Sequence, residues 1–322
     1  MRVAALKTFP IATTPDLDAA LDIFITSRSI KNLSNETIAW YRRRLKTFID
    51  FLKTRDATVQ SFAYHDIIAF VDQLQKTVKP QTVNGFIRAI KAFCSFLCDE
   101  GFRDDNPAKR LAPLKTGLYA PRTLNDAQIT ALINTIAKDA KSFVNLRDLT
   151  LICLMLDCGL RVSEAINLRF DDIDLVNGFV RVIGKGNKER VVPLGETVRM
   201  LLSRYLTKRM TIQCAGDWVF ITSLGTKLTR RQVHKRLATW AKKAGIEGVR
   251  VSPHSLRFTF VRKWLQSGGD SIILQRILGH SSAAMTAYYA ILFASDLQDA
   301  HKRHSPVDGL APMLKLPRKR VT

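Results

Sequence analysis

Apolar residues recur at helical spacing along most of this chain and change to strand-like alternation in one stretch. Between residues 15 and 101 the spacing predicts four amphipathic helices in succession. Residues 171–195 instead contain FVRVIG and ERVVPL, two alternating, β-branched runs joined by Gly-Lys-Gly-Asn, which predict a hairpin. The fold class expected from this pattern is mainly α with a small β-hairpin or sheet. Further helices are expected at residues 146–157, 196–209, 229–244, 254–266 and 271–278.

A connection without helical periodicity separates two helical regions. Residues 103–122 contain three prolines, and proline interrupts helices and favours extended connections. We therefore expect two domains, because 322 residues suffice for two cores of ordinary size. The expected boundaries are 1–111 for a helical domain, 112–122 for the linker, 123–306 for a mixed α+β domain and 307–322 for a basic C-terminal tail.

The chain carries 50 lysines and arginines against 28 acidic residues, a formal net charge of +22. Such an excess predicts binding to a polyanion, most often nucleic acid, although a ribosomal protein or a charge-solubilised protein would show it too. Five cysteines without a secretory signal favour free thiols in a reducing compartment, which predicts the cytoplasm. The longest apolar run, residues 149–156, is too short to span a bilayer, so no membrane partner is expected.

Four short motifs carry residues suited to phosphate chemistry. In SPHSLR, His254 and Arg257 lie three apart and share a face of a helix that begins at Ser-Pro. Arg161 follows a glycine turn after the buried helix, Lys185 stands between glycines at the hairpin tip, and His280 follows a helix stop. Each motif alone has a simpler explanation: a surface arginine paired with the glutamate one turn on, a solvated turn lysine or a structural histidine.

The order and spacing of these motifs resemble the tyrosine recombinases, the family of lambda integrase and the bacterial Xer enzymes. The second domain is similar to that family through GLRVSE, VIGKGNKERVVPL, SPHSLR and LGHSS. The first domain resembles its helical, SAM-like core-binding domain through S-x-x-T-x-x-x-Y at 34–41, KPQT at 79–82 and G-x-x-x-x-NP at 101–107. The resemblance covers nearly the whole chain and implies a core-binding domain followed by a mixed α+β tyrosine-recombinase catalytic domain.

The resemblance implies strand cleavage by a tyrosine, which leaves a 3′-phosphotyrosine and a free 5′-hydroxyl. Two adjacent tyrosines stand in the stretch SSAAMTAYYA, and the family spacing from His280 and Thr286 selects Tyr289 as the nucleophile. Neighbouring helical residues point about 100° apart, so Tyr288 is expected to pack in the domain core. The six catalytic residues implied are Arg161, Lys185, His254, Arg257, His280 and Tyr289.

Each implied catalytic residue type suits a step of this reaction. Because a tyrosine has a pKa of about 10, its attack needs a proton acceptor or a strongly cationic pocket. Arg161 and Arg257 suit the charge that develops on the non-bridging phosphate oxygens, and the two histidines resemble the family's further donors. Lys185 resembles the general acid that protonates the leaving 5′-oxygen. The sequence shows neither a carboxylate cluster for Mg²⁺ nor a GxxxxGK[ST] loop, so no metal or ATP is expected.

Basic residues on the predicted helix faces are candidates for DNA contact, although solvated helix faces often carry the same charges. In the family a helix in the region of residues 228–245 approaches DNA, and with the helical domain it implies a C-shaped clamp around the duplex. The candidates are Arg43, Lys46, Arg88 and Lys91 in the first domain and Arg230, Arg231, Lys235 and Arg236 in the second.

The implied function is site-specific DNA recombination, in integration, excision or resolution, by a protein of host or mobile-element origin. The implied partners are double-stranded DNA with an inverted-repeat core site and further copies of the chain in a tetramer, with room for an accessory DNA-binding protein. The implied location is the bacterial cytoplasm, at the nucleoid. A C-terminal segment with an apolar face is expected to dock on a neighbouring protomer or to lie in its own core. That face comprises Ile291, Leu292, Phe293 and Leu297.

Two other functions remain open. A type IB topoisomerase shares the tyrosine chemistry but relaxes DNA without exchanging partners, and a non-catalytic regulator would bind DNA without cleaving it.

The sequence departs from the family's common residues at Phe258 and at the Ala-Ile pair after Tyr289. Neither position carries chemistry in the family, so the departures bear on the subgroup more than on activity.

Overall fold

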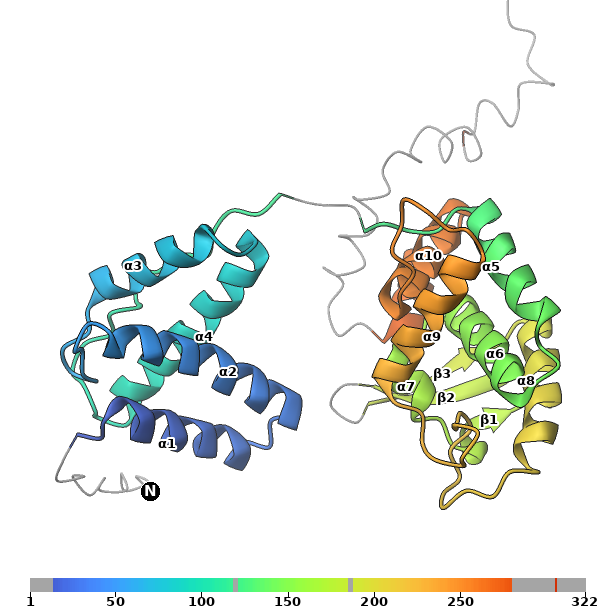
Figure 1. Ribbon diagram of the computed structural model, residues 1–322, viewed down its shortest axis with the longest axis horizontal. Helices are drawn as coiled ribbons and strands as arrows, with labels where there is room; N and C mark the ends of the chain where they lie inside the picture. The colour runs from blue at the N-terminus through green and yellow to red at the C-terminus, as the bar shows by residue number, and fades with distance from the viewer. Residues whose placement is uncertain (1–13, 118–120, 185–187, 280–304, 306–322) are drawn as a thin grey trace, which may run out of the picture. The chain divides into compact units, whose positions relative to one another are not determined.

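The computed structural model describes residues 14–117, 121–184, 188–279 and 305. The chain divides into two compact units, residues 1–117 and 118–322; in Figure 1 the described helices of the first are blue to blue-green and those of the second green to orange. The division falls inside the connection expected at residues 112–122. Within the described residues the chain is mostly helical, with one small antiparallel sheet, as the apolar periodicity predicts.

The described part of the first unit consists of four helices, as expected. Asp16 and Ser34 cap the first two by accepting hydrogen bonds from backbone N–H groups three residues on, and Pro80 begins the fourth. Their apolar faces meet in an aromatic core, in which Phe24 packs edge-on against Phe93 with ring centroids 5.6 Å apart. The helices are α1 (Leu17–Ile30), α2 (Asn35–Lys53), α3 (Tyr64–Gln75) and α4 (Pro80–Asp99).

The second unit packs helices around a three-stranded sheet. The predicted hairpin is confirmed: β2 (Phe179–Ile183) pairs antiparallel with β3 (Glu189–Pro193), with Val182 opposite Arg190, and β1 (Ile173–Asp174) adds a short edge strand. The remaining helices of the described residues are α5 (Asp126–Lys138), α6 (Phe143–Cys158), α7 (Val162–Ile166), the 3₁₀ helix η1 (Phe170–Asp172), α8 (Glu196–Arg209), α9 (Arg230–Lys243), α10 (Pro253–Gln266) and α11 (Ser271–Leu278).

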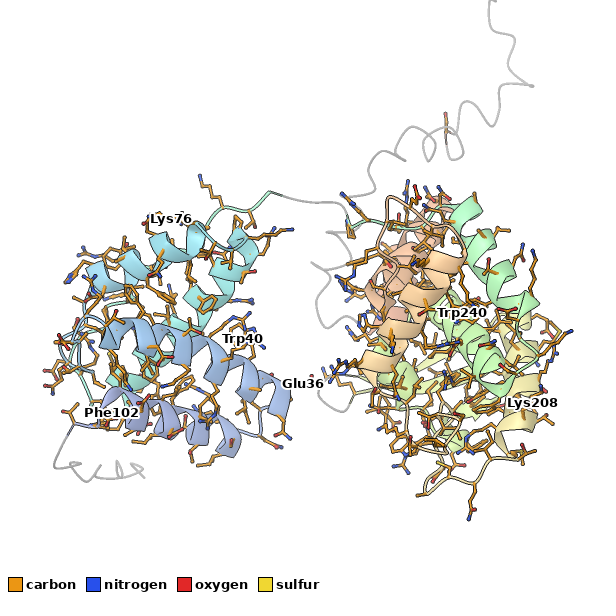
Figure 2. All side chains as sticks on the ribbon, viewed as in Figure 1. Glu36, Trp40, Lys76, Phe102, Lys208 and Trp240 are labelled. Atoms are coloured by element: carbon orange, nitrogen blue, oxygen red, sulfur yellow. The ribbon has the colours of Figure 1, made fainter. Side chains whose placement is uncertain are left out.

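Helix α6 is the central helix of the second unit. It is apolar on nearly every side, because α5, α8 and α10 all pack against it. Its one buried carboxylate, Asp148, accepts hydrogen bonds from Arg147 at 2.6 Å and from the indole N–H of Trp240 at 2.9 Å, and it also pairs with Arg236. A buried charge needs such compensation, so this network ties α9 to α6 (Figure 2 labels Trp240).

Gly159 ends α6 in a conformation that favours glycine. Its backbone is left-handed, with φ 59°, and a Cβ atom there would lie 2.4 Å from Cδ1 of Phe260 and 3.0 Å from Cδ2 of Leu278. Glycine therefore allows the end of α6 to approach α10 and α11 closely. This approach places the residue two positions on, Arg161, beside α10.

We expect Gly159→Ala to lower the free energy of unfolding of the second unit by about 2–5 kcal/mol. The left-handed backbone contributes roughly 1–2 kcal/mol of this loss, and overpacking against Phe260 contributes roughly 1–3 kcal/mol. The measurement is chemical denaturation of the full chain. Gly245→Ala is the matched control, because Gly245 has φ 63° but nothing within 4 Å of a Cβ atom. Equal losses in the two variants would contradict the packing argument.

Candidate active site

Arg161 lies at the turn between α6 and α7, as the N-cap residue of α7. Its backbone N–H donates to Oε2 of Glu164 at 2.8 Å, and its Nη1 donates to Oε1 of the same carboxylate at 2.8 Å. The Glu164 side chain is buried, whereas that of Arg161 is 38% exposed. The pairing with a glutamate that the simpler explanation foresaw is therefore real, but it leaves part of the guanidinium accessible to a ligand.

Arg257 is buried within α10 and held by main-chain oxygens. Its Nη1 donates to the carbonyl of Gly159 at 2.6 Å, and its Nη2 donates to the carbonyl of Leu278 at 3.0 Å. These contacts join the ends of α6 and α11 to α10. Because both acceptors are neutral, they orient the guanidinium without cancelling its charge.

His254 stands one turn before Arg257 on α10 and is exposed. Its ring packs edge-on against Phe258, with centroids 4.1 Å apart, so the residue that departs from the family pattern supports this imidazole. The pKa of His254 is lowered, first by desolvation and then by the positive charges of Arg257 and Arg161. Arg161, which stands far earlier in the chain, thus lies close enough to the His254–Arg257 pair to act on it electrostatically.

We expect His254 to titrate below the usual histidine value of about 6.5 in the free protein. The unfolded chain then binds the imidazole proton at a higher pH than the folded protein does. His254 therefore does not change the free energy of unfolding well above about pH 6.5, and it lowers that free energy as the pH falls below this value. The measurement is an NMR titration of the imidazole C–H signals, assigned with His254→Gln. Replacing Arg161 with glutamine should raise the midpoint, because one of the two facing cations is removed. A wild-type midpoint at or above 6.5 would contradict this environment.

The other three expected catalytic residues, Lys185, His280 and Tyr289, lie outside the described residues, as does Tyr288. The described chain reaches the positions beside two of them. Strand β2 ends at Ile183, two residues before Lys185, and α11 ends at Leu278 before a left-handed Gly279.

Arg190 is a residue that the motif analysis did not single out. It lies on β3 beside the site, with its side chain only 10% exposed, and it donates to both oxygens of Glu164 and to the carbonyl of Ile277. The signal available in the sequence was its alternation with Val192, which places a cation on the inward face of the hairpin.

Among the four DNA-contact candidates of the first unit, two make internal contacts. Lys46 pairs with Asp18 at 3.2 Å and Asp50 at 3.0 Å, and the Nζ of Lys91 donates to the carbonyl of Leu111 at 2.8 Å. Two carboxylates thus compensate the charge of the first lysine, and one of the three N–H donors of the second is bound to the main chain. Their structural role is therefore plain, whatever they contact on DNA.

The other two candidates of the first unit, Arg43 and Arg88, are exposed and make no ion pair with any residue that the structure describes. Both act electrostatically on Arg44, whose Cζ atom lies 4.3 Å from the ring centroid of Trp40 on α2 (Figure 2 labels Trp40). Burial and then the charges of Arg43 and Arg88 lower the pKa of Arg44. These three arginines, which we call the α2–α4 arginine cluster, present concentrated and uncompensated positive charge. Motif spacing gave Arg44 no special place; only its stacking reveals it.

In the second unit, Arg230, Arg231 and Lys235 are exposed on the first turns of α9. Arg236, which the sequence places on the same basic helix, makes internal contacts instead. Its guanidinium pairs with buried Asp148 and donates to Oδ1 of Asn145 at 2.9 Å. A buried carboxylate binds this arginine more firmly than a solvent-facing position would, because the partner cannot be left unpaired.

The described residues contain no group of three or more histidine, cysteine, aspartate or glutamate side chains arranged to hold a metal ion. They also contain no helix that is long and apolar enough to cross a membrane.

Residues 122–295 match the phage integrase family, and residues 27–101 match the phage integrase N-terminal SAM-like domain. The chain is 32% identical to tyrosine recombinase XerD of Proteus mirabilis over 296 residues, which cover 90% of this chain and 94% of that protein. It is 30% identical to tyrosine recombinase XerD of Vibrio cholerae over 299 residues, or 92% of this chain and 98% of that one.

Solved structures show the same fold. The XerH site-specific recombinase bound to its palindromic difH substrate, in a post-cleavage complex, matches with a TM-score of 0.74 and 21% identity, covering 89% of this chain and 84% of that one. A lambda integrase dimer bound to a COC′ core site matches with a TM-score of 0.68 and 18% identity, covering 85% and 77% of the two chains.

Proposed function

Because this chain belongs to the phage integrase family, and so is a tyrosine recombinase that cleaves and rejoins DNA strands at specific sites, we propose that Tyr289 attacks the scissile phosphate while Arg161, His254 and Arg257 bind it. The observation that carries this assignment is the convergence of the two arginines and the histidine from the α6–α7 turn and α10.

The proposed step forms a bond between Oη of Tyr289 and phosphorus and breaks the bond between phosphorus and the 5′-oxygen. Negative charge grows on the non-bridging oxygens, where Arg161 and Arg257 stabilise it. Neutral His254 can accept the phenolic proton or donate a hydrogen bond to the phosphate, with His280 taking the other role. Lys185 gives a proton to the departing 5′-oxygen. The phosphotyrosine retains the bond energy, so a 5′-hydroxyl of another strand can reverse the step without ATP or a metal ion.

Covalent trapping tests this assignment. A duplex nicked near the cleavage position loses its short 5′-hydroxyl fragment after attack, so the protein stays attached to the 3′-phosphate. We expect an adduct that survives denaturation and whose DNA-bearing peptide contains Tyr289. An adduct at Tyr288, or none with a duplex that the protein binds, would contradict the assignment.

We further propose that the first unit contacts DNA through the α2–α4 arginine cluster more than through Lys46 or Lys91. The cluster supports this because its charge has no acidic partner among the described residues, whereas Lys46 is paired twice. Guanidinium groups also bind phosphate oxygens in a planar, bidentate manner. Arg230, Arg231 and Lys235 at the start of α9 are the proposed contacts of the second unit.

We expect Arg88→Ala to lower the slope of log affinity against log salt by about 1, because one phosphate contact is lost with its released counterion. Arg43→Ala should do the same. Lys46→Ala is the control, since its charge is already matched by Asp18 and Asp50, and it should leave the slope within about 0.3 of wild type. The measurement is binding to a cognate duplex at several salt concentrations. A Lys46 effect equal to that of Arg88 would contradict the assignment.

The proposed active assembly is a tetramer on two core sites built from inverted repeats, acting at the bacterial nucleoid. Its C-terminal segment, Ile291 to Leu297, is proposed to dock on a neighbouring protomer. A largely apolar groove of about 590 Å³, lined in part by Ile133, Leu156 and Trp264, offers a surface of suitable chemistry.

Substituting serine for Phe293 and Leu297 should abolish cooperative binding to a duplex with two half-sites; unchanged cooperativity would argue against docking between protomers.

A further inference from the structure

Arg190 makes three hydrogen bonds, one from each nitrogen of its guanidinium group. Its Nη1 and Nη2 donate to the two oxygens of Glu164 at 3.1 and 2.9 Å, and its Nε donates to the carbonyl of Ile277 at 2.6 Å. Arg190 lies on β3, Glu164 on α7 and Ile277 on α11. One side chain therefore joins three elements that surround the candidate active site.

The carboxylate of Glu164 is shared between Arg190 and Arg161. Four hydrogen bonds reach its two oxygens: two from Arg190, one from the Arg161 guanidinium and one from the Arg161 backbone N–H. Burial alone would raise the pKa of Glu164, but the bonds from Arg190 and Arg161 outweigh it and lower the pKa. Glu164 thus remains an anion that binds both guanidinium groups.

The surroundings of Arg190 leave it little freedom to move. A Cβ atom at Gly184 would lie 3.3 Å from its Nη1, and one at Gly279 would lie 3.0 Å from its Cδ. Both glycines directly precede expected catalytic residues in the chain. Arg190 is therefore packed between the end of β2, the end of α11 and the carboxylate that holds Arg161.

We propose that Arg190 is a positioning residue for strand cleavage, which holds the Glu164 carboxylate so that this carboxylate orients the guanidinium of Arg161 toward the scissile phosphate. The proposal builds on the proposed function, because it assigns a residue that acts through Arg161. Without Arg190, Glu164 is free to rotate toward Arg161 alone and to withdraw its guanidinium from the phosphate. Small displacements of a group that stabilises a transition state lower the rate far more than they lower binding.

A purely structural ion pair is the competing explanation, and it predicts a different pattern. A buried pair need not stabilise the fold, because the desolvation of both ions opposes their attraction. If Arg190 served only the fold, its loss would lower the melting temperature and leave the folded protein cleaving at the wild-type rate.

The test is a single-turnover measurement of covalent attachment to a nicked cognate duplex, with protein in saturating excess. We expect Arg190→Met, which keeps much of the apolar packing, to lower the rate about 10–100-fold and to leave the dissociation constant for DNA within about threefold. Arg190→Lys should also attach to DNA at least about tenfold more slowly than wild type. A single ammonium group cannot replace both the planar, two-donor contact with Glu164 and the hydrogen bond to the carbonyl of Ile277. It also serves as the second variant should Arg190→Met fail to fold.

A double-mutant cycle with Arg161→Lys then asks whether Arg190 acts through Arg161. We expect the Arg161→Lys, Arg190→Met protein to cleave no more than about threefold slower than Arg161→Lys alone, because the group being positioned is already altered. Rate losses that multiply in the double variant would overturn the proposal, as would a wild-type rate in folded Arg190→Met.

Two controls separate this role from general effects. Arg181→Gln removes an arginine from the paired strand β2, where it is 46% exposed and contacts Asp172, and it should cleave at the wild-type rate. Asp148→Asn weakens another buried network of the same unit and should lower the melting temperature without a comparable rate loss in the folded protein. Failure of the proposed function itself would show as a wild-type protein that forms no adduct, a result distinct from equal rates in wild type and Arg190→Met.

Discussion

Replacing Tyr289 with phenylalanine is expected to abolish covalent attachment to DNA, a loss of at least about 10³-fold, because the phenyl ring has no oxygen to attack phosphorus. Removal of one hydroxyl leaves the side chain's apolar volume unchanged, so folding and DNA affinity should remain near wild type. The measurement pairs the denaturation-resistant adduct on a nicked duplex with a binding titration on the same duplex. A variant that still forms the adduct would exclude Tyr289 as nucleophile.

Tyr288→Phe is the matched control for this result. The two tyrosines are neighbours with the same chemistry, and they differ in direction by about 100° if both are helical. The Tyr288 variant should therefore form the adduct at close to the wild-type rate. Reversal of the two outcomes would move the nucleophile by one position and would show that the family spacing from His280 does not hold in this chain.

Lysine substitutions at Arg161 and Arg257, the two arginines proposed to bind the phosphate, are expected to lower the cleavage rate about 10²–10³-fold each, the typical effect of removing one donor from a charge-stabilising site. A lysine keeps the charge but loses the planar, two-pronged donor geometry. The measurement is the single-turnover rate of covalent attachment at saturating protein, with the dissociation constant for DNA determined separately.

The two lysine variants should differ in stability. Arg257 is buried and donates to the carbonyls of Gly159 and Leu278, so Arg257→Lys leaves a buried acceptor unpaired and should cost about 1–3 kcal/mol of unfolding free energy. Arg161 is partly exposed and keeps its backbone bond to Glu164, so Arg161→Lys should cost less than about 1 kcal/mol. Equal stability losses, or a cleavage rate near wild type in either variant, would contradict the roles assigned.

Much of the fold could be predicted from apolar spacing. The four helices of the first unit bury one face each, so the apolar stripe that includes Leu45, Phe48 and Ile49 shows directly in the sequence. The hairpin was also predictable, because β-branched alternation and a glycine-containing turn are local signals. The short strand β1 was not predicted: two residues are too few to show a period.

Part of the candidate site could be predicted as well, because motif order carries information that single residues lack. Arg161, His254 and Arg257 were selected from two weak motifs, and the structure brings them within electrostatic range of one another. The placement of Lys185, His280 and Tyr289 stays a prediction, since these residues lie outside the described ones.

Charge on a helix face does not by itself show what a basic residue contacts. On α9 the sequence grouped Arg236 with Arg231 and Lys235, but a residue's direction around the helix decides whether it meets solvent or a neighbouring helix. Arg236 meets the carboxylate of Asp148, which lies 88 positions earlier in the chain. Spacing along one helix cannot reveal a partner at that distance.

The sequence by itself determined the helical periodicity, the hairpin and the order of the catalytic motifs, because each depends on residues that lie near one another in the chain. Only the tertiary structure decided which cations act together. Glu164 binds both Arg161 and Arg190, and Arg190 also reaches Ile277, 87 positions away. The physical reason is that a buried ion must be paired by whatever the fold brings beside it, and that choice is made when α7, β3 and α11 pack together.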